Sequence, residues 1–255
     1  MVLLNIENRI ATLTLNRPEK RNALNDEMAN ILHQHLIELA TNDDCKVLIL
    51  KGNGEAFCAG ADLGYLQQLQ KNSFEENLAD SMSLMKMFKA LYEFPKVSIA
   101  QVQGAAFAGG CGLANLCDFC FATPESKFAY TEVKIGFIPA IVSVFLSPKI
   151  GENAAKRMLL TGEVFNAEQA KEMGLVTDVY EQELIGKLVE DFASRVSAST
   201  SAQSIQLTKA LMNSIKALPL EKQLEMAARA NAEARSTEDC QLGIKSFLNK
   251  EKLSW

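Results

Sequence analysis

Two stretches of small residues stand out as places where the backbone itself can do chemistry. The first is AFCAGAD at residues 56–62, and the second is GAAFAGGCG at residues 104–112. Each follows a strand-like run and precedes a helical pattern, and small residues there allow a ligand to approach the backbone N–H groups closely. If the two turns face one another, they form an oxyanion hole, a pair of fixed donors for charge that develops during a reaction.

Glu132 lies downstream of both turns, in YTEVKIG at residues 130–136, and is a candidate acid/base residue. A carboxylate within reach of a bound substrate transfers a proton or activates water, and such groups contribute about 10²–10⁴-fold to rate. The competing interpretation is a solvated glutamate, the usual fate of this residue type.

Taken together, these segments resemble the enoyl-CoA hydratase/isomerase family, the crotonases. The similarity extends from NRPEKRNAL at residues 16–24 to the tail beginning at Phe247, with several motifs in the family's order. The resemblance implies that the backbone N–H groups of Ala59 and Gly109 hold a thioester oxygen. It also implies that Glu132 matches the second of the two hydratase acids, which is the single acid of many double-bond isomerases.

Gly112 departs from the two-acid pattern, because the hydratases carry a glutamate where this chain reads GGCGL at residues 109–113. Glycine has no side chain that can act as a base or orient water. The departure weakens ordinary hydratase chemistry and favours an isomerase that moves a proton with Glu132 alone.

The segment GFIPAIVS at residues 136–143 points the other way. With Glu132 it resembles the branch that hydrates branched glutaconyl-CoA esters in leucine or isoprenoid breakdown, which can also lack the first acid. Here we expect the apolar pair at residues 141–142 to narrow the pocket after Pro139. We expect the Ser143 hydroxyl to bond water or a polar acyl group.

Coenzyme A recognition requires basic groups for its phosphates. Lys20 and Arg21 lie in a segment that borders the nucleotide in the family, and Lys250 lies in a tail that reaches the coenzyme on a neighbouring subunit. Asp62 is a stronger candidate for a helix cap than for a ligand contact. Further substrate or coenzyme contacts are expected from Ala23, Ala61, Leu63, Phe107 and Gly110.

The elements that position these residues follow from the hydrophobic pattern. Alternation predicts a hairpin over residues 2–15, and strand-like runs at 47–51 and 97–102 lead into the two turns. Helix caps are predicted at Asn25 or Asp26 and at Asn166. Beyond Glu132 the pattern is mostly helical, with a candidate linker at residues 197–204.

We therefore predict an α/β protein. The resemblance refines this to a crotonase-like spiral of ββα units over residues 1–196 and a C-terminal helical oligomerisation region over residues 197–255, assembled as a homotrimer or dimer of trimers.

Composition narrows the function classes. A net charge of −5 argues against general nucleic-acid or membrane-surface binding. No apolar stretch approaches the roughly 20 residues that span a bilayer. The N-terminus shows no secretory signal, so a cytoplasmic protein or a mature organelle form is expected. Cys117 and Cys120 have redox-motif spacing but are interpreted as buried thiols.

The leading hypothesis is an enoyl-CoA hydratase that adds water across a 2,3-double bond, with a branched or carboxylated acyl group preferred. The alternatives are a Δ3,Δ2-enoyl-CoA isomerase and a non-catalytic acyl-CoA-binding protein. Coenzyme A enters as part of the substrate, and no metal or other cofactor is expected.

Overall fold

A six-stranded sheet, in the order β1-β2-β3-β4-β6-β9, runs through the core of the computed structural model, which describes residues 1–255. The first two strands form the antiparallel hairpin predicted over residues 2–15, and the other neighbouring strands pair in parallel. The strands are β1 (Val2–Glu7), β2 (Ile10–Leu15), β3 (Val47–Gly52), β4 (Val97–Val102), β6 (Phe119–Ala122) and β9 (Asp178–Val179).

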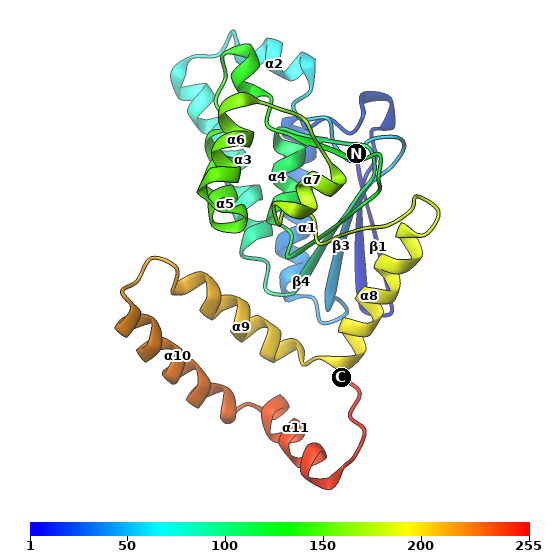
Figure 1. Ribbon diagram of the computed structural model, residues 1–255, viewed down its shortest axis with the longest axis vertical. Helices are drawn as coiled ribbons and strands as arrows, with labels where there is room; N and C mark the ends of the chain where they lie inside the picture. Colours follow the sequence, from blue (N-terminus) through cyan, green and yellow to red (C-terminus); the bar gives the residue numbers. More distant parts are fainter.

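Both faces of this sheet are covered, because the buried strands are apolar at successive positions. Val47 and Ile49 pack toward α8 (Ile185–Ser199), whereas Leu48 and Leu50 pack into the larger apolar cluster on the opposite face. That opposite face is covered by α1 (Asp26–Thr41), α3 (Phe74–Tyr92) and α4 (Gly109–Leu116) (Figure 1).

A second, smaller sheet was not predicted from the sequence. It consists of β5 (Ala105–Phe107), β7 (Lys127–Ala129) and β8 (Phe165–Asn166), with β5 and β7 parallel. Since β5 lies inside the second small-residue stretch, this sheet fixes where that turn sits relative to the chain that follows β7.

Two helices begin at the capping residues that the sequence predicted. The Asn25 side chain accepts the Met28 N–H at 2.9 Å, and Asn166 forms a capping box at the start of α7 (Ala167–Glu172). The remaining short elements are η1 (Pro18–Lys20), α2 (Leu63–Leu69), η2 (Glu132–Ile135), α5 (Ala140–Ile150) and α6 (Glu152–Thr161).

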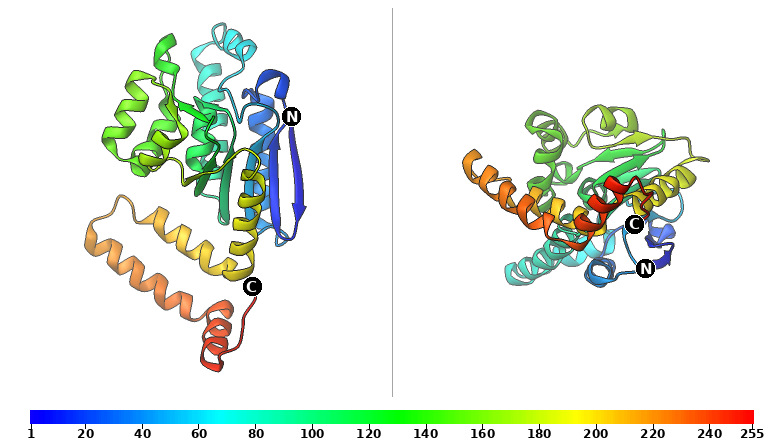
Figure 2. Two further views of the ribbon diagram at one scale, coloured as in Figure 1. Left: turned by 45° about the vertical axis from the view of Figure 1, so that its right-hand side comes forward. Right: turned by 90° about the horizontal axis from the view of Figure 1, so that it is seen from below.

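The last three helices form an arm that extends away from the core (Figures 1 and 2). The helical arm consists of α9 (Ala202–Ser214), α10 (Leu220–Arg235) and α11 (Glu238–Asn249). The predicted linker at 197–204 is shorter than expected, since α8 continues to Ser199 and α9 begins at Ala202. No helix of the protein combines the length and the apolar character that crossing a membrane requires.

Candidate active site

The two small-residue turns lie side by side and are joined by backbone hydrogen bonds. The Cys58 N–H donates to the Ala105 carbonyl oxygen at 3.0 Å, and the Phe107 N–H donates to the Cys58 carbonyl oxygen at 2.9 Å. A Cβ at Gly110 would lie 2.3 Å from the Cys58 carbonyl oxygen, so only glycine permits this approach. The turns therefore face one another as an oxyanion hole requires.

The free donor of the first turn is Ala61 and not Ala59. The Ala59 N–H donates to the Arg21 carbonyl oxygen at 3.0 Å and is therefore occupied. On either side of Ala61, the Leu24 N–H donates to the Gly60 carbonyl oxygen at 2.7 Å, and the Asp62 N–H donates to the Leu24 carbonyl oxygen at 2.8 Å. In such a parallel bridge the central residue directs its own N–H to the other side. The Ala61 N–H has no acceptor within the chain.

The second donor is the N–H of Gly109, the first residue of α4. The N–H groups of a helix's first turn have no intrahelical acceptor, and no other group of the chain accepts from Gly109. The preceding Ala108 has φ 49° and ψ −121°, a conformation that a residue with a Cβ adopts only under strain. Its N–H is held by the Ala129 carbonyl oxygen at 2.8 Å, which fixes the direction of the helix start.

Glu132 follows β7, and β7 runs parallel to β5, so both strands deliver their carboxyl ends to the same edge. This places Glu132 near the helix start at Gly109. Its carboxyl group is half-buried, and Oε2 is buried without a hydrogen-bond partner. Burial raises the pKa of Glu132, and a hydrogen bond from its own backbone offsets only part of that effect. A buried carboxyl group with a raised pKa is a candidate for proton transfer.

Gly112 faces apolar side chains where the two-acid pattern has a carboxylate. A Cβ at Gly112 would lie 2.5 Å from Val142 Cγ1 and 3.2 Å from Phe88 Cε1. The position of the absent carboxylate is therefore closed by an apolar wall, formed by Val142 and Phe88 packed against Gly112. Val142 belongs to the unusual segment at residues 136–143, so the two departures seen in the sequence are one structural feature.

The comparison with known proteins agrees with this geometry. Residues 5–255 match the family model described as enoyl-CoA hydratase/isomerase. The chain belongs to the enoyl-CoA hydratase/isomerase family.

Individual relatives span almost the whole chain. A candidate enoyl-CoA hydratase of Thermus thermophilus is 42% identical, and the alignment covers 94% of this chain and 95% of the relative. The (E)-benzylidenesuccinyl-CoA hydratase of Thauera aromatica is 34% identical, with 96% and 95% covered. The crystal structure of an enoyl-CoA hydratase from Shewanella pealeana has a TM-score of 0.93 at 32% identity, with 100% and 95% covered. The predicted crotonase fold is thereby confirmed.

Within this family fold, Asp62 acts as a helix cap, as the sequence analysis favoured. Its Oδ1 accepts the Gly64 N–H at 2.8 Å, and its Oδ2 pairs with the Arg17 guanidinium at 3.0 Å. Burial alone raises a carboxyl pKa, but hydrogen bonds from Arg17 and the helix start outweigh it and leave the pKa of Asp62 lowered. Sequence reasoning missed the role of Arg17, which also donates to the Ala23 carbonyl oxygen at 2.8 Å.

The structure brings most of the other candidates to this region. Lys20, the last residue of η1, and Arg21, whose carbonyl oxygen accepts the Ala59 N–H, are exposed beside the first turn. Leu63 is exposed at the start of α2, and Phe107 ends β5. Ser143 donates its hydroxyl to the Ala140 carbonyl oxygen at 2.7 Å, inside its own helix after Pro139.

Lys250 is the candidate that a single chain does not bring to the site. It caps the C-terminus of α11, at the end of the molecule opposite α2 (Figure 1).

Proposed function

We propose that this protein is an enoyl-CoA hydratase in which Glu132 is the only catalytic carboxyl group. The observation that carries the proposal is the half-buried Glu132 carboxyl, with an unpartnered oxygen, at the edge where two backbone N–H groups are free. In this proposal Ala61 takes the place that the sequence analysis gave to Ala59, and Gly109 keeps its role.

The reaction needs these three groups and one water. The thioester oxygen accepts hydrogen bonds from the Ala61 and Gly109 N–H groups. Glu132, as a carboxylate, takes a proton from water while the water oxygen bonds to C3 of the enoyl group. The π-electron pair of the double bond moves toward the thioester as an enolate, which the two donors stabilise. Glu132 then returns the proton to C2, so one water has been added.

A second candidate is a Δ3,Δ2-enoyl-CoA isomerase, which the wall at Gly112 favours. Such a reaction needs no water and only one carboxyl group, since Glu132 would remove a proton from C2 of a 3-enoyl ester and return it to C4. The apolar packing of Val142 and Phe88 against Gly112 leaves no second carboxylate there to orient water.

For the substrate we propose a branched or carboxylated enoyl-CoA, such as 3-methylglutaconyl-CoA. The segment at residues 136–143 supports a branched acyl group, because Val142 of this segment forms an apolar wall against Gly112. The relative from Thauera aromatica supports it by name, since a benzylidenesuccinyl group is both substituted and carboxylated.

We further propose that copies of the chain assemble through the helical arm, as a homotrimer or dimer of trimers. Large apolar side chains of α10 and α11 are exposed in the single chain, Phe247 at 83% among them. Such exposure is typical of a surface that another chain covers. In that assembly Lys250 would join Lys20 and Arg21 at the coenzyme A phosphates.

Mass spectrometry of reaction products tests the function directly. Wild type and Glu132→Gln receive a 2-enoyl-CoA, a 3-enoyl-CoA and 3-methylglutaconyl-CoA, with Glu190→Gln, an exposed glutamate on α8, as the matched control. Hydration appears as the gain of one water that Glu132→Gln loses and the control keeps. Isobaric conversion of the 3-enoyl ester would support the isomerase. Binding of all three esters without conversion would overturn both enzymatic proposals.

A further inference from the structure

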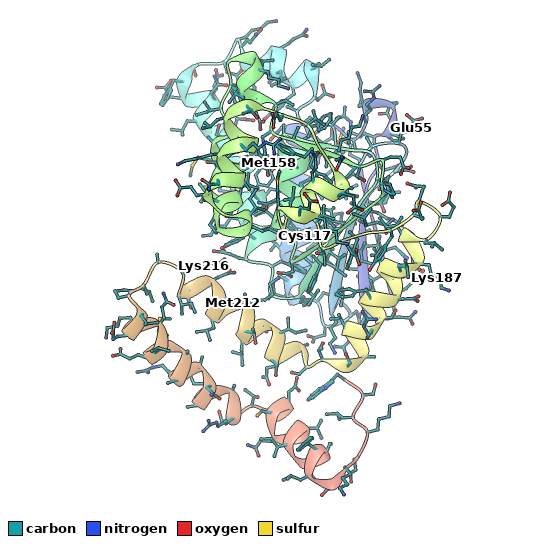
Figure 3. The ribbon with its side chains drawn as sticks, viewed as in Figure 1. Glu55, Cys117, Met158, Lys187, Met212 and Lys216 are labelled. Carbon is teal, nitrogen blue, oxygen red and sulfur yellow. The ribbon has the colours of Figure 1, made fainter.

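A cavity of about 210 Å³ lies between the core and the helical arm, away from the proposed oxyanion hole. It is bordered by the C-terminal end of α4, by α5 and by α9. Asn115, on its wall, lies six residues beyond Gly109 in α4, which corresponds to about 9 Å along the helix axis. Figure 3 shows Met212 of α9, and Lys216 just beyond this helix, on the side of the core where Cys117 follows α4.

Asn115 borders this cavity, and its side-chain amide is buried without a hydrogen-bond partner. The residue is 3% exposed, and neither Nδ2 nor Oδ1 has a hydrogen-bond partner. A buried polar group without a partner costs about 1–3 kcal/mol, so such groups ordinarily meet a ligand or water. The cavity is several times the ~30 Å³ that one water occupies in the liquid, which leaves room for a larger polar molecule.

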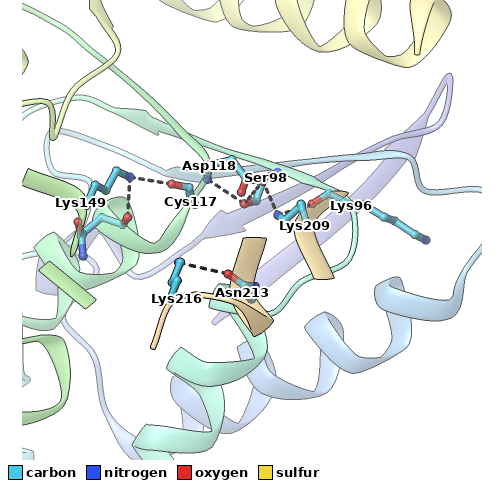
Figure 4. A network of polar contacts seen from close by, with 9 residues as sticks. Lys96, Ser98, Cys117, Asp118, Lys149, Lys209, Asn213 and Lys216 are labelled. Atoms are coloured by element: carbon cyan, nitrogen blue, oxygen red, sulfur yellow. Dashed lines mark hydrogen bonds and ion pairs between the residues drawn. The ribbon is translucent and has the colours of Figure 1, made fainter. Parts of the chain in front are cut away.

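Three ammonium groups surround the same space (Figure 4). Lys149 donates to the Asn115 and Cys117 carbonyl oxygens at 2.6 and 2.8 Å. Lys209 donates to the Lys96 carbonyl oxygen at 2.9 Å and to Asp118. Since an ammonium group has three N–H donors, each of these lysines keeps one free.

Lys216 completes the set, with the Tyr92 hydroxyl and the Asn213 side chain as its partners. Asp118 is the only carboxylate on the cavity wall and already pairs with Lys209. The side chains that line the cavity therefore have a positive formal charge, with three lysines against one aspartate. The cavity beside Asp62 has the opposite character, since carboxylates outnumber its single arginine.

We propose that the cavity between α4, α5 and α9 is a binding site for a phosphate group, with hydrogen phosphate as the simplest ligand. The spare N–H groups of the lysines and the Asn115 Nδ2 donate to phosphate oxygens. Asn115 Oδ1 accepts from the P–OH group that hydrogen phosphate carries near neutral pH. The bound anion links the helical arm, through Lys209 of α9 and Lys216 just beyond α9, to the core, through Lys149 and Asn115.

Calorimetric titration with inorganic phosphate near neutral pH, at constant ionic strength, tests the proposal on the full chain. We expect saturable binding of one phosphate per chain. Sulfate has no proton to donate to Asn115 Oδ1, so we expect sulfate to bind about tenfold more weakly. Adenosine 3′,5′-bisphosphate serves as a second probe. If it displaces phosphate, the site accepts a nucleotide phosphate, and if it does not, the free ion is the ligand.

Two cavity variants and one control decide the outcome. Asn115→Asp, which replaces the amide donor with a carboxylate, and Lys216→Met, which removes an exposed ammonium group, should each weaken phosphate binding about tenfold or more. Lys156→Met on α6, which breaks an exposed pair with Glu152, should leave it unchanged. The proposal is overturned if the wild type shows no saturable binding or if both cavity variants bind phosphate as the wild type does.

Discussion

Replacing Gly112 by alanine tests what fills the position of the absent carboxylate. The new Cβ would lie 2.5 Å from Val142 Cγ1, whereas carbon atoms pack best at about 3.5–4.0 Å. Valine is stiff at χ1 and cannot easily move away. Overpacking of this kind costs about 1–3 kcal/mol. The better helix propensity of alanine returns about 1 kcal/mol. We therefore expect Gly112→Ala to lower the free energy of unfolding by up to about 2 kcal/mol.

A double-mutant cycle isolates the contact. Val142→Ala removes both γ-methyl groups and with them the 2.5 Å contact, so that the 3.2 Å approach to Phe88 Cε1 is the closest one left and the helix-propensity gain remains. The double variant should be more stable than the sum of the single effects predicts, with a coupling energy of about 1–3 kcal/mol. Urea unfolding of the wild type, the two single variants and the double variant, all at the same protein concentration, measures this coupling energy. The reasoning is refuted if Gly112→Ala stabilises the protein by about 1 kcal/mol and its effect adds to that of Val142→Ala.

Four further predictions concern the site and its support. Glu132→Gln should lower turnover about 10²–10⁴-fold while acyl-CoA binding persists, as steady-state kinetics and equilibrium binding would show; near-normal turnover would contradict the mechanism. Because burial raises the pKa of Glu132, kcat/KM should fall with decreasing pH around a midpoint above the ordinary value of about 4.3, and a midpoint at or below it would exclude Glu132 as the base. The same shift means that wild type loses stability as pH rises through the raised pKa, so Glu132→Gln should gain melting temperature over wild type at alkaline pH and not at acid pH. Asn22→Ala should lower the unfolding free energy by at least about 2 kcal/mol in urea unfolding, because the buried Asn22 amide donates to Asn53 and Ala56 and accepts from the Arg17 N–H; a change below about 1 kcal/mol would show that these bonds contribute little.

The Gly112 geometry also bears on engineering of a second acid. Gly112→Glu would need to displace both Val142 and Phe88 before its carboxyl could reach the substrate. We therefore expect no gain in crotonyl-CoA hydration from this substitution alone, measured by the loss of enoyl absorbance. A tenfold or greater gain in crotonyl-CoA hydration would show that Val142 and Phe88 can move aside for the glutamate side chain.

Sequence patterns predicted the parts of this fold that depend on neighbouring residues. The hairpin follows from alternation over twelve strand positions, and the Asn25 and Asn166 caps follow from side chains that bond a backbone group three residues away. The two turns could be located because strand-like runs lead into them. Very short strands such as β8 and β9, with two residues each, leave no such pattern.

The details of the site depend on partners distant in the chain, which is why the sequence did not reveal them. Whether Ala59 or Ala61 has a free N–H depends on where Arg21 and Leu24 lie across the turn. The Arg17–Asp62 pair joins residues 45 positions apart. The packing of Val142 against Gly112 depends on how α5 crosses α4. None of these contacts has a periodicity or a spacing that could be recognised.

The two proposed donors belong to the main chain, and this changes how the site can evolve. Only proline at position 61 would remove the amide proton. Every other substitution there keeps the proposed backbone hydrogen-bond donor. Selection acts instead on the glycine at 110, whose missing side chain permits the two turns to touch. In a library of all single substitutions, most variants at Ala61 should keep activity and most variants at Gly110 should lose it, because the proposed donors depend on the backbone fold. Substitutions in the apolar wall could then change substrate specificity without removing these donors.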